Sequence, residues 1–519
     1  MKKRNLTIVL VIVLCMMLGT ACGSMPAESK TTPVAAEVAL ENINKGLMMA
    51  DASLHDPAMA KGEDGKYYMY GSHMTAATST DLRNWKMFGN GVDANNPMFD
   101  NLVVEPFEAF EFVGKNNEGW YSVWAPCIIY NDVMGKYMMY FCTTSSYIKS
   151  NLCFATADEI GGPYTYQDTI LYSGFAKLTA RETNIYDIIP DDKTAILQYD
   201  IGAGFNNGTW PNCIDPALFY DEENRLWMVY GSWSGGIFLL EIDKATGQII
   251  HPEEDLDNGV DDYYGKRLVG GMHHAIEGPH IEYDKESGYY YLFVSYGGLT
   301  RVGGYQIRVY RSEKVDGPYV DMKGNTVWEE ENIQDYGVKL MGNYTLPNLN
   351  AAYMAPGGQS AYTDEDGKKY VVYHQRFDMG TEYHEPRVHQ YFINEEGWPV
   401  VAPHATSGES LSENGYDAAA LTGTFYLLNH GSAVDAVVNE PMEAHFADGT
   451  ITGDVSGTYT VTEGTNFAQV TIDGVTYKGV LVEMLDDTNN ATFNFTGIGN
   501  NNQSLWGVHY IEALQTVEE

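Results

Sequence analysis

The sequence predicts an all-β protein, with a five-bladed β-propeller followed by a small β-barrel or β-sandwich domain. A unit of proline, apolar stretch, turn and aromatic strand occurs five times. The chain has 53 Gly and 38 Tyr among 519 residues, and 13% of the residues are aromatic, as expected for many short strands joined by turns. From residue 407 onward the only Lys or Arg is Lys478, and Thr, Gly, Asn and Asp become frequent, which indicates a change of domain.

The N-terminus has the features of an export signal. Basic residues at positions 2–4 precede an apolar stretch over 6–18, which is too short to span a bilayer, so residues 1–21 are predicted to be a signal peptide. The segment 18–23 is similar to a bacterial lipobox, which would place a lipid on the thiol of Cys22. Ordinary cleavage near Ala21 is the alternative. Residues 22–44 are predicted to be a flexible tether, and the protein an extracellular one held at the cell surface by lipid.

The propeller is predicted over residues 45–406. Its five units begin at His55-Asp56-Pro57, Trp124-Ala125-Pro126, Ile214-Asp215-Pro216, Glu277-Gly278-Pro279 and Met354-Ala355-Pro356. Each unit contains two strand-like runs around a turn, which is the pattern of a β-hairpin. Units of four short strands repeated radially describe a β-propeller. A β-sandwich with coincidental repetition is the alternative.

The last domain is predicted over residues 407–519. Alternating segments over 458–461 and 468–472 are typical of strands, and Asp473-Gly474 directly after the second is a hairpin turn signal.

Composition excludes some functions. The chain has 31 Lys and Arg against 70 Asp and Glu, a formal net charge of −39. So negative a protein repels phosphate backbones and anionic headgroups. We therefore expect no nucleic-acid partner, membrane contact only through the N-terminal anchor, and a monomer.

Four cysteines remain beyond the leader and Cys22: Cys127, Cys142, Cys153 and Cys213. They form no CxxC pair and show no zinc-ligand spacing. Buried free thiols in strands are the simpler interpretation. A disulfide between Cys142 and Cys153 is the alternative, because export permits disulfides.

Three unit starts carry an acid: Asp56, Asp215 and Glu277. Residues at the same place in each blade meet at one end of the propeller axis, so we expect these carboxylates to converge there in register. Like charges in one site raise one another's pKa, as acid–base catalysis requires when one carboxyl stays protonated and another ionised. A turn-capping role for Asp before Pro is the alternative.

These motifs resemble the family-43 glycoside hydrolases, whose three acids lie in His-Asp-Pro, Ile-Asp-Pro and Glu-Gly-Pro-His. The similarity covers roughly residues 48–405. It implies a five-bladed propeller that inverts configuration, with Asp56 as general base, Glu277 as general acid and Asp215 as the group that tunes the pKa and orientation of Glu277.

Within the family the chain is similar to the larger extracellular endo-α-1,5-L-arabinanases. The similarity rests on segments 374–377, 389–390 and 394–403 and on the trailing domain. It implies that His374 faces a central metal, usually calcium. A hydrogen-bonded core histidine is the alternative, because calcium prefers oxygen ligands.

Sugar contacts are predicted at two segments that resemble the arabinanase cleft, and at one tryptophan that could be an aromatic platform or blade packing. They are Asn212, Cys213 and Ile214, then Ser232, Trp233 and Ser234, then Trp124.

The resemblance therefore implies inverting endo-hydrolysis of the α-1,5-L-arabinofuranosidic bonds in arabinan, the side chains of pectin, with calcium as cofactor. An exo-acting α-L-arabinofuranosidase or β-xylosidase of the same family is one alternative. A non-catalytic carbohydrate-binding propeller lipoprotein is another.

Overall fold

The computed structural model describes residues 31–189, 195–202 and 204–514. The predicted signal peptide, Cys22 and the first part of the predicted tether lie outside the described residues. Within the described part of the chain, no helix has the length and apolarity needed to cross a membrane.

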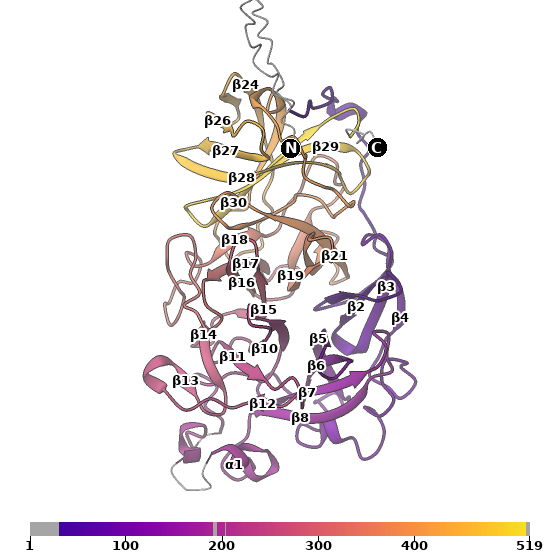
Figure 1. The fold of residues 1–519 in the computed structure, drawn as a ribbon, viewed down its shortest axis with the longest axis vertical. Helices are drawn as coiled ribbons and strands as arrows, with labels where there is room; N and C mark the ends of the chain where they lie inside the picture. Colours follow the sequence, from indigo (N-terminus) through magenta and orange to yellow (C-terminus); the bar gives the residue numbers. More distant parts are fainter. Residues whose placement is uncertain (1–30, 190–194, 203, 515–519) are drawn as a thin grey trace, which may run out of the picture.

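The fold is all-β and propeller-like, and an eight-stranded barrel lies at its upper end in Figure 1. The strands of two four-stranded sheets are β1 (Ala58–Lys61), β2 (Tyr67–Gly71), β3 (Thr75–Ser79) and β4 (Lys86–Gly89), then β5 (Ser122–Asn131), β6 (Lys136–Thr144), β7 (Ser150–Ala157) and β8 (Thr165–Ser173). A third sheet contains β9 (Ala217–Tyr220), β10 (Leu226–Tyr230), β11 (Ile237–Ile242), β12 (Ile249–Ile250), β13 (Val260–Asp261) and β14 (Gly265–Val269).

Two further groups of strands complete the propeller-like part. They are β15 (Ile276–Asp284), β16 (Tyr289–Tyr296), β17 (Gln306–Ser312) and β18 (Val338–Met341), then β19 (Tyr353–Thr363), β20 (Lys369–Phe377), β21 (His384–Ile393) and β22 (Pro399–Val401). Helices are few and short: α1 (Ile185–Ile188) and the 3-10 turns η1 (Leu40–Asn42), η2 (Ser72–Met74), η3 (Glu108–Phe110), η4 (Ala180–Glu182), η5 (Ala195–Gln198), η6 (Leu256–Asn258) and η7 (Ala418–Ala420). The predicted hairpins are all present, because β1–β2, β5–β6, β9–β10, β15–β16 and β19–β20 pair antiparallel.

Each proline that begins a predicted unit follows a backbone kink. The residue before it has a left-handed φ: +51° at Asp56, +41° at Ala125, +57° at Asp215, +57° at Gly278 and +50° at Ala355. For a residue other than glycine this conformation costs about 1–2 kcal/mol. The kink interrupts the alternation of side chains, and β5, β15 and β19 show register shifts there.

This kink corrects the predicted register of the acids. Gly278, and not Glu277, occupies the position of Asp56 and Asp215. Glu277 lies one residue earlier, at the position of His55. The acids still meet, because the kink lets two consecutive residues face the same cavity, as His55 and Asp56 do just before β1.

The C-terminal strands close into a barrel. They are β23 (Gly423–Asn429), β24 (Met442–Ala447), β25 (Thr450–Gly453), β26 (Gly457–Val461), β27 (Phe467–Ile472), β28 (Val475–Leu485), β29 (Ala491–Gly499) and β30 (Gln503–Tyr510). Neighbours pair in order, and β30 pairs with β23 to close the ring. A core that contains Phe425, Val470 and Phe493 fills the interior.

The barrel is joined to the propeller-like part through backbone and side chains. Strand β30 adds to the edge of β18 at Lys339 and Gln503, so the two parts share one sheet. Asp487, between β28 and β29, accepts hydrogen bonds from Tyr353 Oη at 2.7 Å and the Ala405 backbone amide at 3.0 Å. These contacts hold the barrel against the last sheet of the propeller-like part.

The second half of the predicted tether is not free. Glu37 forms a β-bridge with Ile511, and the Val38 amide donates to the Tyr510 carbonyl at 2.9 Å. Val34 packs against the barrel core. Residues 31–44 of the predicted tether thus lie against the barrel, and the partners Tyr510 and Ile511 are more than 400 residues away in the sequence.

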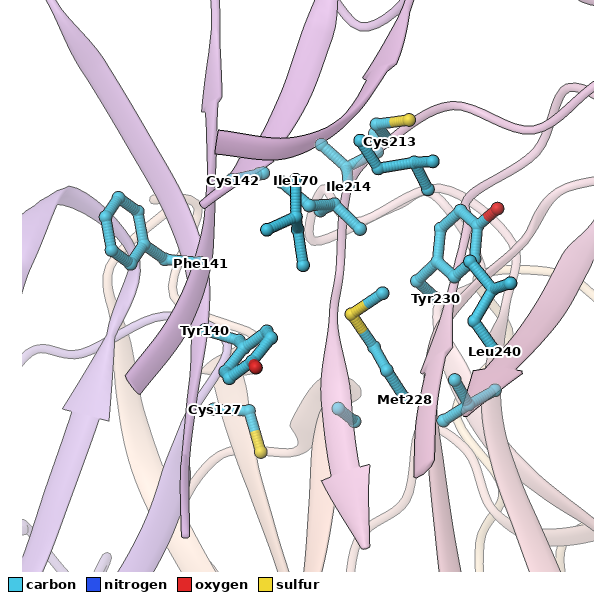
Figure 2. Close-up of a cluster of buried hydrophobic side chains, with 14 of the residues drawn as sticks. Cys127, Tyr140, Phe141, Cys142, Ile170, Cys213, Ile214, Met228, Tyr230 and Leu240 are labelled. Atoms are coloured by element: carbon cyan, nitrogen blue, oxygen red, sulfur yellow. The ribbon is translucent and has the colours of Figure 1, made fainter. Parts of the chain in front are cut away.

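The four cysteines are buried and free, as the simpler interpretation predicted. Cys142 is paired with Leu152, whereas Cys153 is paired with Phe141. Successive residues of a strand point to opposite faces, so these two thiols cannot form a disulfide. Figure 2 shows Cys127, Cys142 and Cys213 among buried side chains such as Met228.

Candidate active site

One cavity of 1240 Å³ lies where the innermost strands begin. Its lining includes residues from or next to β1, β5, β9, β15 and β19. Asp56, Asp215 and Glu277 all line it, so the structure brings the three predicted acids together.

Asp56 is held in its ionised form. His55 Nδ1 lies 2.7 Å from Asp56 Oδ2, and Ser72 Oγ donates to the same oxygen at 2.6 Å. Burial alone would raise the pKa of this carboxyl, but the charge and hydrogen bond of His55 and the hydrogen bond of Ser72 outweigh it and lower the pKa below the ordinary Asp value. A carboxylate of this kind can accept a proton from water.

Ser72 connects two blades at this point, since its oxygen also accepts from the Ala125 amide at 2.9 Å. Replacing Ser72 by Ala removes a hydrogen bond to the ionised form of Asp56, so we expect the pKa of Asp56 to rise. The acidic limb of the kcat/KM profile should then move to higher pH, with a loss of stability of about 1 kcal/mol. A pH–rate profile and thermal unfolding measure the two effects. An unchanged acidic limb would show that Ser72 does not tune Asp56.

Glu277 has the opposite character. Burial raises its pKa above the ordinary Glu value, and the negative charge of Asp56 adds to this effect. Hydrogen bonds from Tyr305, Ser232 and Trp233 act in the lowering direction without cancelling it. Trp233 Nε1 donates to Glu277 Oε2 at 2.7 Å, and Ser232 Oγ donates to that oxygen at 3.2 Å. These donors fix the orientation of a carboxyl that can keep its proton.

Asp215 resembles Glu277 in having a raised pKa. Burial, followed by the charges of Glu277 and Asp56, raises its pKa well above the ordinary Asp value. The Gly278 amide donates to Asp215 Oδ2 at 3.1 Å. This bond ties Asp215 to the residue next to Glu277, so the two carboxyls are coupled by structure as well as by charge.

His374 lies behind the cavity lining. Its ring stacks on His55 with centroids 3.8 Å apart and on Tyr305 at 5.7 Å, and its side chain is fully buried. Nδ1 accepts from the Asp56 amide at 3.4 Å, whereas Nε2 is buried without a hydrogen-bond partner. Burial, then the charge of His55, holds its pKa well below the ordinary His value, so the imidazole is neutral and can ligate a metal.

The donor set near His374 fits calcium only in part. Ligand atoms of His55, Asp56 and His374 lie within 4.8 Å of one another. Calcium takes six to eight oxygen ligands, and this group offers one carboxylate and two imidazoles. The unpartnered Nε2 is compatible with one ligand position, so water would have to supply most of the others.

The backbone at Gly358 lies tightly against this group. Its φ is +58°, and a Cβ there would lie 2.5 Å from Asp56 Oδ1 and 2.8 Å from His374 Nδ1. Only glycine therefore fits between the carboxylate and the imidazole.

Five of the predicted sugar contacts line the cavity: Trp124, Asn212, Ile214, Ser232 and Trp233. Cys213 and Ser234 do not, which corrects their prediction. Cys213 is fully buried, and Figure 2 shows it among the side chains of the core, where its backbone amide donates to Ser173 Oγ at 3.0 Å. Ser234 is also buried, and its hydroxyl donates to Asn212 Oδ1 at 2.8 Å.

Sequence reasoning missed Ser72, Tyr305 and Gly358. Ser72 and Tyr305 come from outside the repeated motif, and nothing distinguishes Tyr305 from the other tyrosines in the sequence. His55 was quoted only as part of a motif, although its position beside Asp56 could have marked it as a partner.

A cavity in which one carboxyl is kept ionised and others have raised pKa values defines a glycoside hydrolase type of site. The chain belongs to glycosyl hydrolases family 43, whose model matches residues 49–178 and 202–399. A C-terminal lipocalin-like domain matches residues 403–507.

Relatives cover nearly the whole chain. Extracellular endo-alpha-(1->5)-L-arabinanase 2 of Bacillus subtilis is 37% identical over 88% of this chain and 93% of its own length. The extracellular endo-alpha-(1->5)-L-arabinanase of Thermotoga petrophila is 35% identical over 89% of this chain and 94% of its own. The crystal structure of the endo-1,5-alpha-L-arabinanase from Thermotoga petrophila superposes with a TM-score of 0.76, at 34% identity, over 90% of this chain and 99% of that one.

Proposed function

We propose that the protein is an extracellular endo-α-1,5-L-arabinanase. The observation that carries the proposal is the set of three carboxyls in one cavity, with the pKa of Asp56 lowered and those of Glu277 and Asp215 raised. Relatives with this activity in their names, 35–37% identical over most of the chain, supply the substrate class.

The proposed reaction inverts the anomeric centre. Asp56 removes a proton from a water molecule on one face of the sugar, and Glu277 gives its proton to the leaving oxygen on the other face. Asp215, tied to the Gly278 amide, orients the segment that carries Glu277, and in its ionised form its charge would raise the pKa of the acid. Trp233 and Ser232 hold the carboxyl of Glu277 in place, and Trp124 offers an aromatic face to the sugar.

A time course on debranched arabinan tests the function. An endo enzyme releases mixed oligosaccharides early, whereas release of arabinose alone from the start would favour the exo-acting alternative. Proton NMR of the first-formed anomer tests the stereochemistry, because retention would exclude the inverting scheme.

We also propose five blades around one axis, with β15–β18 as the fourth. In support, strands β1, β5, β9, β15 and β19 all contribute to the same cavities. The single bridge from β18 to β30 then attaches the barrel to a blade. The lipid anchor at Cys22 is a further proposal, supported by the sequence of the leader, and mass spectrometry of the mature protein tests it.

Calcium is proposed to bind at His374 Nε2, with water as its other main ligands. Replacing His374 by Ala should abolish this site. After chelation, added calcium should therefore raise the Tm of the unmodified protein but not that of His374→Ala. Elemental analysis of the purified protein gives a second measurement. Equal calcium content in both proteins would place the ion elsewhere.

A further inference from the structure

A second cavity, of 610 Å³, lies at the opposite ends of the same strands. The candidate active site uses the first halves of β1, β5, β9, β15 and β19 or the residues just before them. The second cavity uses all of β1, the second halves of the other four strands, and the turns after β1 and β19. Its volume is within the range of about 300–1,000 Å³ that small-molecule sites occupy. We call it the far cavity.

A thin layer of side chains separates the two cavities. Ala58, Cys127, His280 and Ser360 line both. These four residues are buried, with exposed fractions of 6%, 5%, 9% and 6%. Because Asp56 and Glu277 line only the first cavity, a ligand in the far cavity does not reach them.

Tyrosines from four strands surround the far cavity. Tyr130, Tyr220, Tyr283 and Tyr362 lie at or near the ends of β5, β9, β15 and β19, and all four line the cavity. They are partly exposed, with 48% of Tyr130 accessible. A fifth tyrosine of the lining, Tyr137, lies edge-on to Tyr130 with ring centroids 5.1 Å apart. A tyrosine offers an apolar face to the C–H groups of a sugar and a hydroxyl to its oxygens.

The charged groups of the far cavity favour a neutral ligand rich in hydroxyls. Lys61 is the only Lys or Arg among the described residues of its lining, and it is paired with Asp364 at 3.1 Å. Glu282 accepts hydrogen bonds from Tyr391 at 2.7 Å and from Thr363. Glu63 and Glu365 also line the cavity, and their carboxylates are acceptors for sugar hydroxyls. An anionic ligand would meet uncompensated negative charge.

We propose that the far cavity is a second carbohydrate-binding site, which holds a short stretch of neutral pentose polysaccharide without cleaving it. The identity of the sugar as arabinan rests on the proposed function. A chain held there keeps the enzyme on the polysaccharide and raises the effective concentration of further bonds at the active site. The second site should therefore raise kcat/KM on long substrates and leave it unchanged on short oligosaccharides.

The experiment counts binding sites on the full-length protein with Glu277→Gln, so that the ligand survives. Titration calorimetry with a short linear arabino-oligosaccharide should give two sites. Adding Tyr130→Ala should weaken one of them about tenfold. Glu63→Gln is a second variant of the far cavity, and Trp120→Ala is the matched control, because Trp120 is 70% exposed and lines neither cavity.

Kinetics with Glu277 intact complete the test. Tyr130→Ala should lower kcat/KM on long arabinan several-fold and leave it unchanged on the short oligosaccharide, while Trp120→Ala changes neither. If the protein has a single binding site, which persists in Tyr130→Ala and Glu63→Gln, and still hydrolyses the oligosaccharide, the far-cavity proposal is wrong and the proposed function stands. Absence of that hydrolysis in the unmodified protein would overturn the proposed function instead.

Discussion

Replacing Asp56 by Asn, or Glu277 by Gln, should lower kcat on linear arabinan by about 10²- to 10⁴-fold. Both changes keep the size of the side chain and remove the ability to exchange a proton. Asp56→Asn leaves the water without a base, and Glu277→Gln leaves the departing oxygen without an acid. Initial rates of reducing-end release measure the loss, and circular dichroism checks that each variant is folded.

The leaving group separates the two roles. In an aryl arabino-oligosaccharide with an acidic phenol, the phenolate leaves without protonation. Glu277→Gln should therefore recover much of its activity on this substrate, and Asp56→Asn should not. Asp158→Asn is the matched control, because the side chain of Asp158 is 83% exposed and pairs with Lys136 on the surface. Equal recovery of both variants would contradict the assignment of acid and base.

The second large effect is expected on stability in acid. His389 is fully buried, its Nδ1 lies 2.8 Å from the Ala402 carbonyl, and burial lowers its pKa to about 4. An unfolded histidine titrates near 6.5, so the unfolded chain takes up a proton that the folded chain refuses. The neutral ring contributes its full share to the free energy of unfolding above pH 6.5. This contribution falls by about 3 kcal/mol as the pH falls to about 4.

Other groups also titrate over this pH range, so the effect of His389 on stability is isolated by comparison with a variant. Asp261, whose pKa is raised by burial to about 6, changes stability in the opposite direction over the same range. Urea unfolding at pH 7 and pH 4.5 should therefore show a smaller loss for His389→Asn than for the unmodified protein. His445→Gln is the control, since the His445 side chain is 53% exposed. Parallel losses in all three proteins would contradict the prediction.

The blade hairpins could be predicted because their signals are local. Proline, turn and aromatic strand lie within one short stretch of sequence, and each stretch folds into neighbouring strands. The convergence of the acids was also predictable, but their register was not. The kink at the residue before each proline is a backbone property, and it moved Glu277 to the position of His55.

The unpredicted parts depend on contacts between distant segments. Tyr305 lies between β16 and β17, yet it packs on His374 from β20. Cys213 was predicted as a sugar contact because its segment resembles the arabinanase cleft, although its side chain is fully buried in the core. The docking of residues 31–44 on the barrel likewise has no local sequence signal.

The bridge between Glu37 and Ile511 joins segments far apart in the sequence and has a consequence for the order of folding. Strand β30, which ends at Tyr510, completes three separate pairings, with β18, β23 and β29. Neither the barrel nor the outer edge of β18 is complete until β30 has been synthesised. Residues 31–44, the barrel and the outer edge of β18 therefore lack these partners until β30 is available, so the assembly depends on contacts of very long sequence separation.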